Sequence, residues 1–203
     1  MTGIVFMKSK LPPAPNFANI DSTSAQTAGD RTRVLALIGN LVFTWSNNES
    51  MFIYFLQVLL KTDFSSAAIT FVSLNTTRAR LDLVRRLAKD KIDEPKVVRR
   101  IERLIERFNV CTKVRNEFNH CIYQLNEAGQ FTHTTILRVT EKKTNLQYAE
   151  VREFDERRIQ EMTRTIRKLT ILNRDLWAFL PELERSVNGG GKPAKGKSSR
   201  RSS

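Results

Sequence analysis

The feature that most constrains this chain is a long series of apolar residues at helical spacing between residues 30 and 61. Its members recur every three or four positions: Val34, Ile38, Leu41, Trp45, Phe52, Leu56 and Leu59. This period places them along one side of an α-helix, whereas a half-buried strand would require strict alternation. A helix of this length needs partners to cover its apolar stripe, so the sequence predicts a bundle of helices.

Three further segments have the same period and supply those partners. They cover residues 65–89, 95–121 and 155–181. Pro95 suits the first turn of its helix, where a missing N–H does no harm, and Pro181 is expected to end the last helix. Four long helices therefore form the predicted core.

The period changes between the third and fourth helices. Residues 121–125, 131–139 and 146–152 alternate and are rich in β-branched side chains, which is typical of strands. Turn-forming residues separate them at 127–129 and 142–145. The predicted fold is therefore mainly α, a four-helix-bundle-like domain with a small three-stranded antiparallel β-meander, about 121–152, inserted before the last helix.

Three regions are expected along the chain. Residues 1–29, which are rich in proline, serine and threonine, predict an irregular N-terminal arm. Residues 30–187 form the helical domain, and residues 188–203 predict a disordered basic tail. Neither a signal peptide nor a membrane-spanning segment is expected, because the apolar runs are short and interrupted by charges.

The chain is strongly basic. It has 34 Lys and Arg residues against 21 Asp and Glu residues, for a net charge of +13. The tail contributes only five of these charges, so most of the excess belongs to the helical domain. A field of this sign attracts polyanions, which favours a nucleic acid as partner, although any anionic partner is compatible with it.

Polar residues interrupt the apolar stripe near the end of the third helix. At 100° per residue, Arg115 and Asn119 fall in the middle of the stripe, and Asn116 and His120 fall at its edge. A buried guanidinium without a partner is very costly. Arg115 is therefore expected to meet a carboxylate, to face a cleft, or to contact another subunit.

The first two helices show the same pattern. Glu49 lies within the stripe of the first helix, and Arg78 and Asp82 lie within that of the second. We expect these charges to meet, with Glu49 pairing with Arg115 or Arg78, and Arg78 with Asp82. Such a network can be purely structural and fix the helix register. It can also line a polar cleft, in which His120 would move protons beside a bound phosphate.

The order Arg115-Asn116-x-x-x-His120 resembles the Arg-x4–6-His signature of the HEPN superfamily, in which the motif stands near the end of a long helix of a helical bundle. The resemblance implies an endoribonuclease that needs no metal ion. His120 would act as general base or acid at the ribose 2′-OH and the leaving oxygen. Arg115 would hold the scissile phosphate, and Asn116 would orient His120 or that phosphate.

The same resemblance implies partners. In the superfamily two motifs usually meet across a homodimer, and members include toxins with cognate antitoxins and defence components. RNA, a second copy of the chain, and an antitoxin or regulatory partner are therefore expected, with no membrane partner. Other members have lost nuclease activity, so the alternative is a non-catalytic helical interaction or dimerisation module. On an ideal helix Arg115 and His120 are about 140° apart, and they converge only if the helix frays or if a partner subunit supplies one of them.

No metal site and no cofactor are predicted. The two histidines and two cysteines are scattered, without an HExxH or paired CxxC pattern, and no glycine-rich phosphate loop follows a strand. Cys111 and Cys121 are read as reduced packing residues, which fits a cytoplasmic protein.

Overall fold

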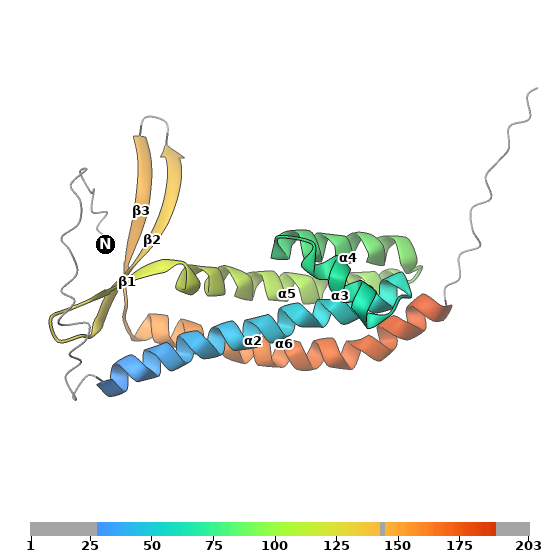
Figure 1. Ribbon diagram of the computed structural model, residues 1–203, viewed down its shortest axis with the longest axis horizontal. Helices are drawn as coiled ribbons and strands as arrows, with labels where there is room; N and C mark the ends of the chain where they lie inside the picture. The colour runs from blue at the N-terminus through green and yellow to red at the C-terminus, as the bar shows by residue number, and fades with distance from the viewer. Residues whose placement is uncertain (1–27, 143–144, 190–203) are drawn as a thin grey trace, which may run out of the picture. The chain divides into compact units, whose positions relative to one another are not determined.

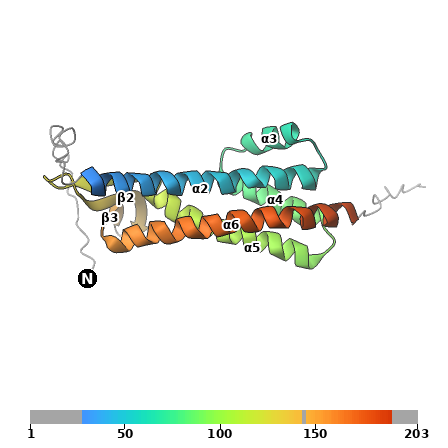
Figure 2. The same cartoon turned by 90° about the horizontal axis from the view of Figure 1, so that it is seen from below.

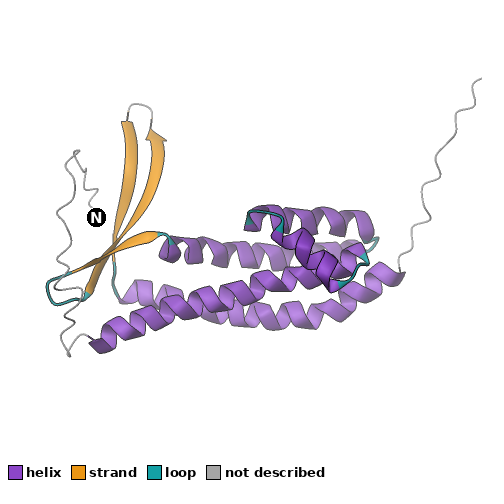
Figure 3. Cartoon of the chain, viewed as in Figure 1, coloured by secondary structure: helices purple, strands orange, loops and turns teal. Residues whose placement is uncertain are grey.

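The computed structural model describes residues 28–142 and 145–189. This part of the chain contains five helices and one three-stranded sheet (Figures 1 and 3). The helices are α2 (Ala28–Leu60), α3 (Phe64–Val72), α4 (Thr77–Lys91), α5 (Pro95–Asn119) and α6 (Glu156–Gly189), and the strands are β1 (Cys121–Leu125), β2 (Phe131–Lys142) and β3 (Asn145–Glu153). The predicted fold, mainly helical with a small antiparallel meander before the last helix, is confirmed.

The chain divides into two compact units. In the first, residues 28–46 of α2 join residues 109–170, which comprise the end of α5, the whole sheet and the start of α6. In the second, residues 47–108 join residues 171–189, the rest of α6.

The sheet is a meander in the order β1-β2-β3, with both pairs antiparallel. The first turn places Gly129 at φ 76°, a left-handed conformation that glycine adopts without strain. β1 pairs only with the first half of β2, from Phe131 to Ile136. β3 pairs with β2 along its length, so the outer half of the β2–β3 hairpin is two-stranded (Figure 1).

The core of the first unit is formed by apolar side chains of its three helical segments and by Phe154, which lies between β3 and α6. Its buried members include Leu41, Trp45, Cys111, Phe118, Phe154, Met162 and Leu169. Phe154 follows β3, and its ring lies 5.6 Å from that of Phe131 on β2. Phe154 therefore packs on the sheet at the start of the connection to α6.

The core of the second unit is built on phenylalanine. Phe52 of α2 contacts Phe108 of α5, with ring centroids 5.6 Å apart, and Phe55 contacts Phe179 of α6 at 5.8 Å. All four side chains are fully buried. The short helix α3 lies beside the second half of α2 in both views (Figures 1 and 2), and Phe64 meets Tyr54 there at 5.4 Å.

The single helix predicted over residues 65–89 is wrong in one respect, because α3 ends at Val72 and α4 begins at Thr77. Each helix has its own N-cap. Asp63 accepts a hydrogen bond from the N–H of Ser66, and Thr76 accepts one from the N–H of Ala79. The Thr76 cap satisfies an N–H group that a continuous helix would have bonded internally.

Pro181 does not end the last helix, which continues to Gly189. The apolar stripe of α6 extends past the proline, and Leu183 and Val187 are buried. Burying such side chains stabilises the fold by roughly 1.5–3 kcal/mol each, which offsets the hydrogen bond lost at a proline.

The remaining predicted boundaries differ by a few residues. α2 begins at Ala28, two residues before Asp30, and α5 ends at Asn119. The predicted irregular arm lies outside the described residues up to residue 27, as does the predicted disordered tail from residue 190 onward. Among the helices of the described ranges, none combines the length and apolarity required to cross a bilayer.

Candidate functional site

Arg115 lies on α5, in the first unit, and is half-buried. Its guanidinium carbon is 3.9 Å from the centre of the Trp45 ring on α2. Its Nη1 donates a hydrogen bond of 2.8 Å to Oδ1 of Asn116. The face of an aromatic ring is electron-rich and attracts a guanidinium, so the apolar stripe accommodates this charge.

The Trp45 ring is itself held in place. Its Nε1 donates a hydrogen bond of 2.8 Å to Oγ1 of Thr112, one turn before Arg115 on α5. The indole is buried, with 5% of its surface exposed. The guanidinium of Arg115 thus stacks on an aromatic ring whose orientation is fixed by a hydrogen bond.

The other motif residues lie at the end of α5. Asn116, Asn119 and His120 are all exposed. The helix ends at Asn119, and the N–H of His120 still bonds the carbonyl of Asn116 at 3.1 Å. Asn116 is therefore hydrogen-bonded to Arg115 through its side chain and to His120 through its backbone.

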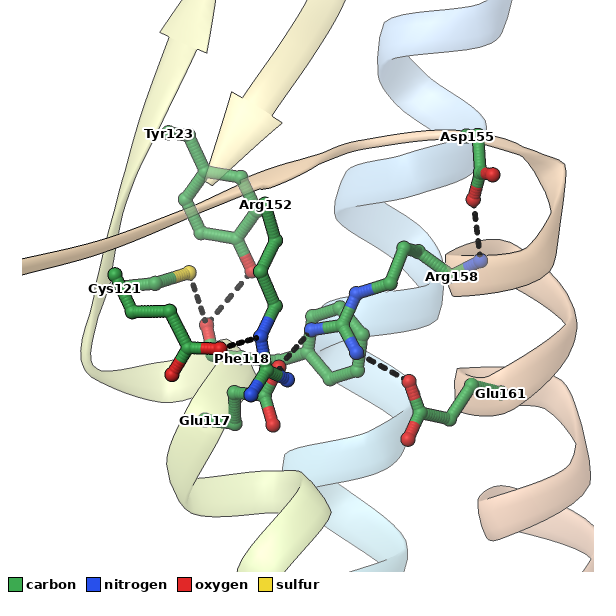
Figure 4. Close-up of polar contacts among 9 residues, drawn as sticks. Glu117, Phe118, Cys121, Tyr123, Arg152, Asp155, Arg158 and Glu161 are labelled. Atoms are coloured by element: carbon green, nitrogen blue, oxygen red, sulfur yellow. Dashed lines mark hydrogen bonds and ion pairs between the residues drawn. The ribbon is translucent and has the colours of Figure 1, made fainter. Parts of the chain in front are cut away.

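Glu117 stands in the middle of the motif, on the side of α5 opposite to Arg115 and Asn119. Its carboxylate accepts hydrogen bonds from Arg152 of β3, at 2.5 Å, and from Arg158 of α6 (Figure 4). The second nitrogen of Arg158 bonds Glu161 one turn along α6. We call these four residues, Glu117, Arg152, Arg158 and Glu161, the Glu117 cluster.

The central pair of the Glu117 cluster is largely shielded from water. The side chains of Glu117 and Arg158 are 19% and 11% exposed. The Arg158 guanidinium carbon also lies 4.3 Å from the centre of the Phe118 ring. A shielded ion pair of this kind is costly to break, so it ties the end of α5 to both β3 and α6.

The carbonyl of Phe118 forms a second anchor at the same place. It accepts a hydrogen bond of 2.7 Å from the Tyr123 hydroxyl and a weaker contact of 3.6 Å from the Cys121 thiol (Figure 4). Burial raises the pKa of the Tyr123 phenol and also the pKa of the Cys121 thiol. Tyr123 therefore stays protonated and keeps donating to a carbonyl that α5 leaves unbonded at its end.

The predicted supporting charges Glu49, Arg78 and Asp82 belong to the second unit. There Glu49 forms an ion pair of 3.1 Å with Arg80 and accepts a hydrogen bond of 2.6 Å from Thr77. The Arg78 side chain is 93% exposed and lies 3.9 Å from Asp82, the one predicted pair that is observed.

Arg80 takes the place predicted for Arg78 because α4 is a new helix. The phase counted from Ala67 is lost at the break between Val72 and Thr77. Counting from Thr77 instead places Arg80 on the side of the buried residues Leu81 and Val84.

The Glu117 cluster and the contact of Trp45 with Arg115 are not predictable from the sequence. Glu117 is 35 residues from Arg152 and 41 from Arg158, so no local pattern connects them. Helical spacing places Trp45 in the core as an apolar residue, but it does not reveal the cation–π contact with Arg115. Among residues 28–142 and 145–189, no group of three His, Cys, Asp or Glu side chains could hold a metal ion.

The end of α5 thus carries a cation held on a ring, two exposed amides and an exposed imidazole. Together these groups can bind a phosphodiester and transfer protons. Comparison with known proteins adds nothing to this picture, since no family model, no curated protein and no solved structure matches the chain.

Proposed function

We propose that this chain binds RNA and cleaves it without a metal ion, through Arg115, Asn116 and His120, as a HEPN-like endoribonuclease of toxin or defence type. The observation that carries the proposal is the hydrogen bond between Arg115 Nη1 and Asn116 Oδ1, directly before the exposed His120. A fixed positive charge, an amide and an imidazole thus stand at one helix end.

The proposed reaction is a transfer of the phosphoryl group within the RNA. A base, His120, takes the proton of the ribose 2′-OH as its oxygen bonds to phosphorus. The bond from phosphorus to the 5′-oxygen breaks, and that oxygen receives a proton from an acid. The products are a 2′,3′-cyclic phosphate and a free 5′-OH, and the guanidinium of Arg115 neutralises the charge that builds on the phosphate oxygens.

A homodimer would supply the acid. One imidazole cannot be both protonated and unprotonated in the same step, so a second His120 from a partner copy would serve as the acid. This arrangement follows the HEPN resemblance. It also allows Arg115 and His120 of different copies to converge on one phosphate.

A basic surface of α6 supports RNA as the substrate. Arg157, Arg164, Arg167 and Lys168 are all exposed. Three of them, Arg157, Arg164 and Lys168, lie within about 40° of one another around the helix. We call these four residues the basic face of α6. Such a face binds the phosphate backbone and releases its counterions. Both cysteines are free thiols, which supports a reducing compartment such as the cytoplasm.

Cleavage of single-stranded RNA of mixed sequence in EDTA tests this proposal. The wild-type chain should cut, and His120→Ala and Arg115→Ala should not. His133→Ala is the matched control, because His133 is the other histidine of the chain, is exposed, and lies on β2. A 2′,3′-cyclic phosphate on the product would identify the 2′-OH as nucleophile. Cleavage that survives His120→Ala would refute the assigned role.

The alternative function is a non-catalytic interaction module. The ion pair between Glu49 and Arg80 favours it, since both side chains are mostly buried and serve the packing of α2 and α4. A folded, dimeric wild-type chain that cuts no RNA in the same assay would support the module.

A further inference from the structure

A hollow of about 330 Å³ lies beside the motif, within the first unit. α2 contributes Arg31, Leu35 and Ile38, which are spaced at i, i+4 and i+7 and so share a face. The sheet contributes Tyr123 and Phe131, and the motif contributes Asn119. The hollow is at the small end of the range for ligand pockets, which fits a single flat ring system better than a long chain.

The aromatic wall of the hollow is rigid. The rings of Tyr123 and Phe131 meet edge to face, with centroids 5.6 Å apart and an angle of 71°. The Tyr123 hydroxyl is bound to the Phe118 carbonyl, and the Phe131 ring also packs on Phe154. A fixed aromatic surface favours stacking of another flat ring, because little side-chain freedom is lost when that ring binds.

The polar groups of the hollow specify which ring system fits. Asn119 is exposed and offers one acceptor and two donors, the pattern that reads the edge of a nucleobase. Arg31 supplies a positive charge, and no carboxylate is present among the eight lining residues. A neighbouring hollow of about 350 Å³ shares Arg31 and Phe131 with it, but its lining also includes three carboxylates, those of Asp30, Asp155 and Glu156.

We propose that this hollow binds one nucleobase of single-stranded RNA, with Tyr123 and Phe131 as the stacking wall and Asn119 as the reader of the base edge. The inference rests on the proposed function. Asn119 and His120 are consecutive residues, with Cα atoms about 3.8 Å apart. A base held at Asn119 therefore places its own ribose or the next phosphate within reach of His120. The enzyme would select unpaired RNA, since a base inside a duplex cannot enter the hollow.

Two substitutions on α2 form a matched test. Leu35 is 52% exposed and lines the hollow, whereas Phe43 is 65% exposed and does not line it. Leu35→Glu and Phe43→Glu each replace an exposed apolar side chain of the first unit by the same negative charge. Because neither side chain is buried, both variants should fold, which circular dichroism and urea unfolding would verify.

Binding is measured in a His120→Ala background, so that no RNA is cut. The probe is a short single-stranded RNA that contains one 2-aminopurine, a base whose fluorescence falls on stacking. Leu35→Glu should weaken binding about tenfold and abolish the quenching, as loss of one stacked base does. Phe43→Glu should change the affinity by less than about twofold, since long-range charge effects are screened by salt. Asn119→Ala should keep the quenching and reduce the preference among the four bases.

Three results would overturn the inference. Equal losses for Leu35→Glu and Phe43→Glu would show that only charge matters. RNA binding without any quenching would mean that the base stays outside the hollow. A change of oligomeric state in Leu35→Glu with unchanged RNA affinity would assign the hollow to a second copy of the chain. The cleavage assay in EDTA is independent, so a selective loss in Leu35→Glu with no cleavage by the wild type would retain the base site and reject the nuclease.

Discussion

The guanidinium carbon of Arg115 lies 3.9 Å from the centre of the Trp45 ring, so the positive charge of the motif rests on an aromatic face. The indole N–H is bonded to Thr112, which leaves the ring one orientation. A planar guanidinium can stack on this ring and still present N–H groups at its edge, whereas an ammonium group cannot.

Arg115→Lys is therefore expected to reduce RNA cleavage sharply although the charge is retained. We expect a fall of about a hundredfold in the cleavage rate, as is typical when one stabilising donor is lost. The free energy of unfolding should fall by only about 1 kcal/mol, the value of a cation–π contact. Arg167→Lys, on the exposed basic face of α6, is the control and should leave both quantities unchanged. A fully active Arg115→Lys would contradict a role for the stacked guanidinium.

Glu117→Gln should destabilise the first unit strongly. The change leaves the shielded guanidinium of Arg158, which is 11% exposed, without its main countercharge. Removal of one partner from such a pair costs about 3 kcal/mol. Glu161→Gln removes the other carboxylate on Arg158, but Glu161 is 40% exposed and the cost should be about 1 kcal/mol or less. Urea unfolding of the two variants checks the difference, and equal losses would speak against Glu117 as the anchor.

Tyr123 predicts a dependence of stability on alkaline pH. Burial raises its pKa in the folded chain, so above about pH 10 the unfolded chain loses the phenolic proton first. The contribution of Tyr123 to the free energy of unfolding is thus complete below that pH, and it is lost as the pH rises further.

Tyr123→Phe should remove this part of the alkaline decline and cost about 1 kcal/mol at neutral pH, where the hydrogen bond to Phe118 is lost. The exposed Tyr148 provides the control, and Tyr148→Phe should alter neither quantity. Urea unfolding as a function of pH measures both effects. An alkaline decline that is the same in Tyr123→Phe as in the wild type would show that Tyr123 does not cause it.

The basic face of α6 predicts the salt dependence of RNA binding. Replacement of Arg164, Arg167 and Lys168 by glutamine should weaken binding to all sequences alike. The slope of log affinity against log salt should fall by about 2, since each lost contact to single-stranded RNA contributes about 0.7. A triple glutamine variant of the exposed Lys61, Arg86 and Arg185 in the second unit is the control of equal charge. The same slope in both variants would mean that only net charge counts.

Much of the fold could be predicted from the sequence, because helical and strand periods are local properties. The stripe that includes Leu41 and Phe52, and the alternation of the meander, were both confirmed. The break after Val72 could not be foreseen, since no proline or glycine marks it and the cap at Thr76 competes with a continuous helix. The passage of α6 through Pro181 depends on burial of later residues, which the proline itself does not reveal.

Only the motif residues of the candidate site could be predicted from the sequence, and the Glu117 cluster could not. Spacing placed Arg115 and Asn116 near the end of the helix, and His120 directly follows that end. The activity proposed for these residues stays a prediction. Spacing says which side of a helix a residue occupies, but it does not identify partners that are distant in sequence. For that reason the pairing of Glu117 with Arg152 and Arg158 emerged only from the folded chain.

Glu117 and His120 are expected to differ in how freely they can change during evolution. Glu117 is bonded to Arg152 of β3, so a lineage that deleted the meander would also have to replace a shielded carboxylate. Loss of the proposed activity, by contrast, would require only a change at the exposed His120. If the proposal holds, descendants of this chain without the activity should keep Glu117 and the inserted sheet together, while the residue at position 120 varies.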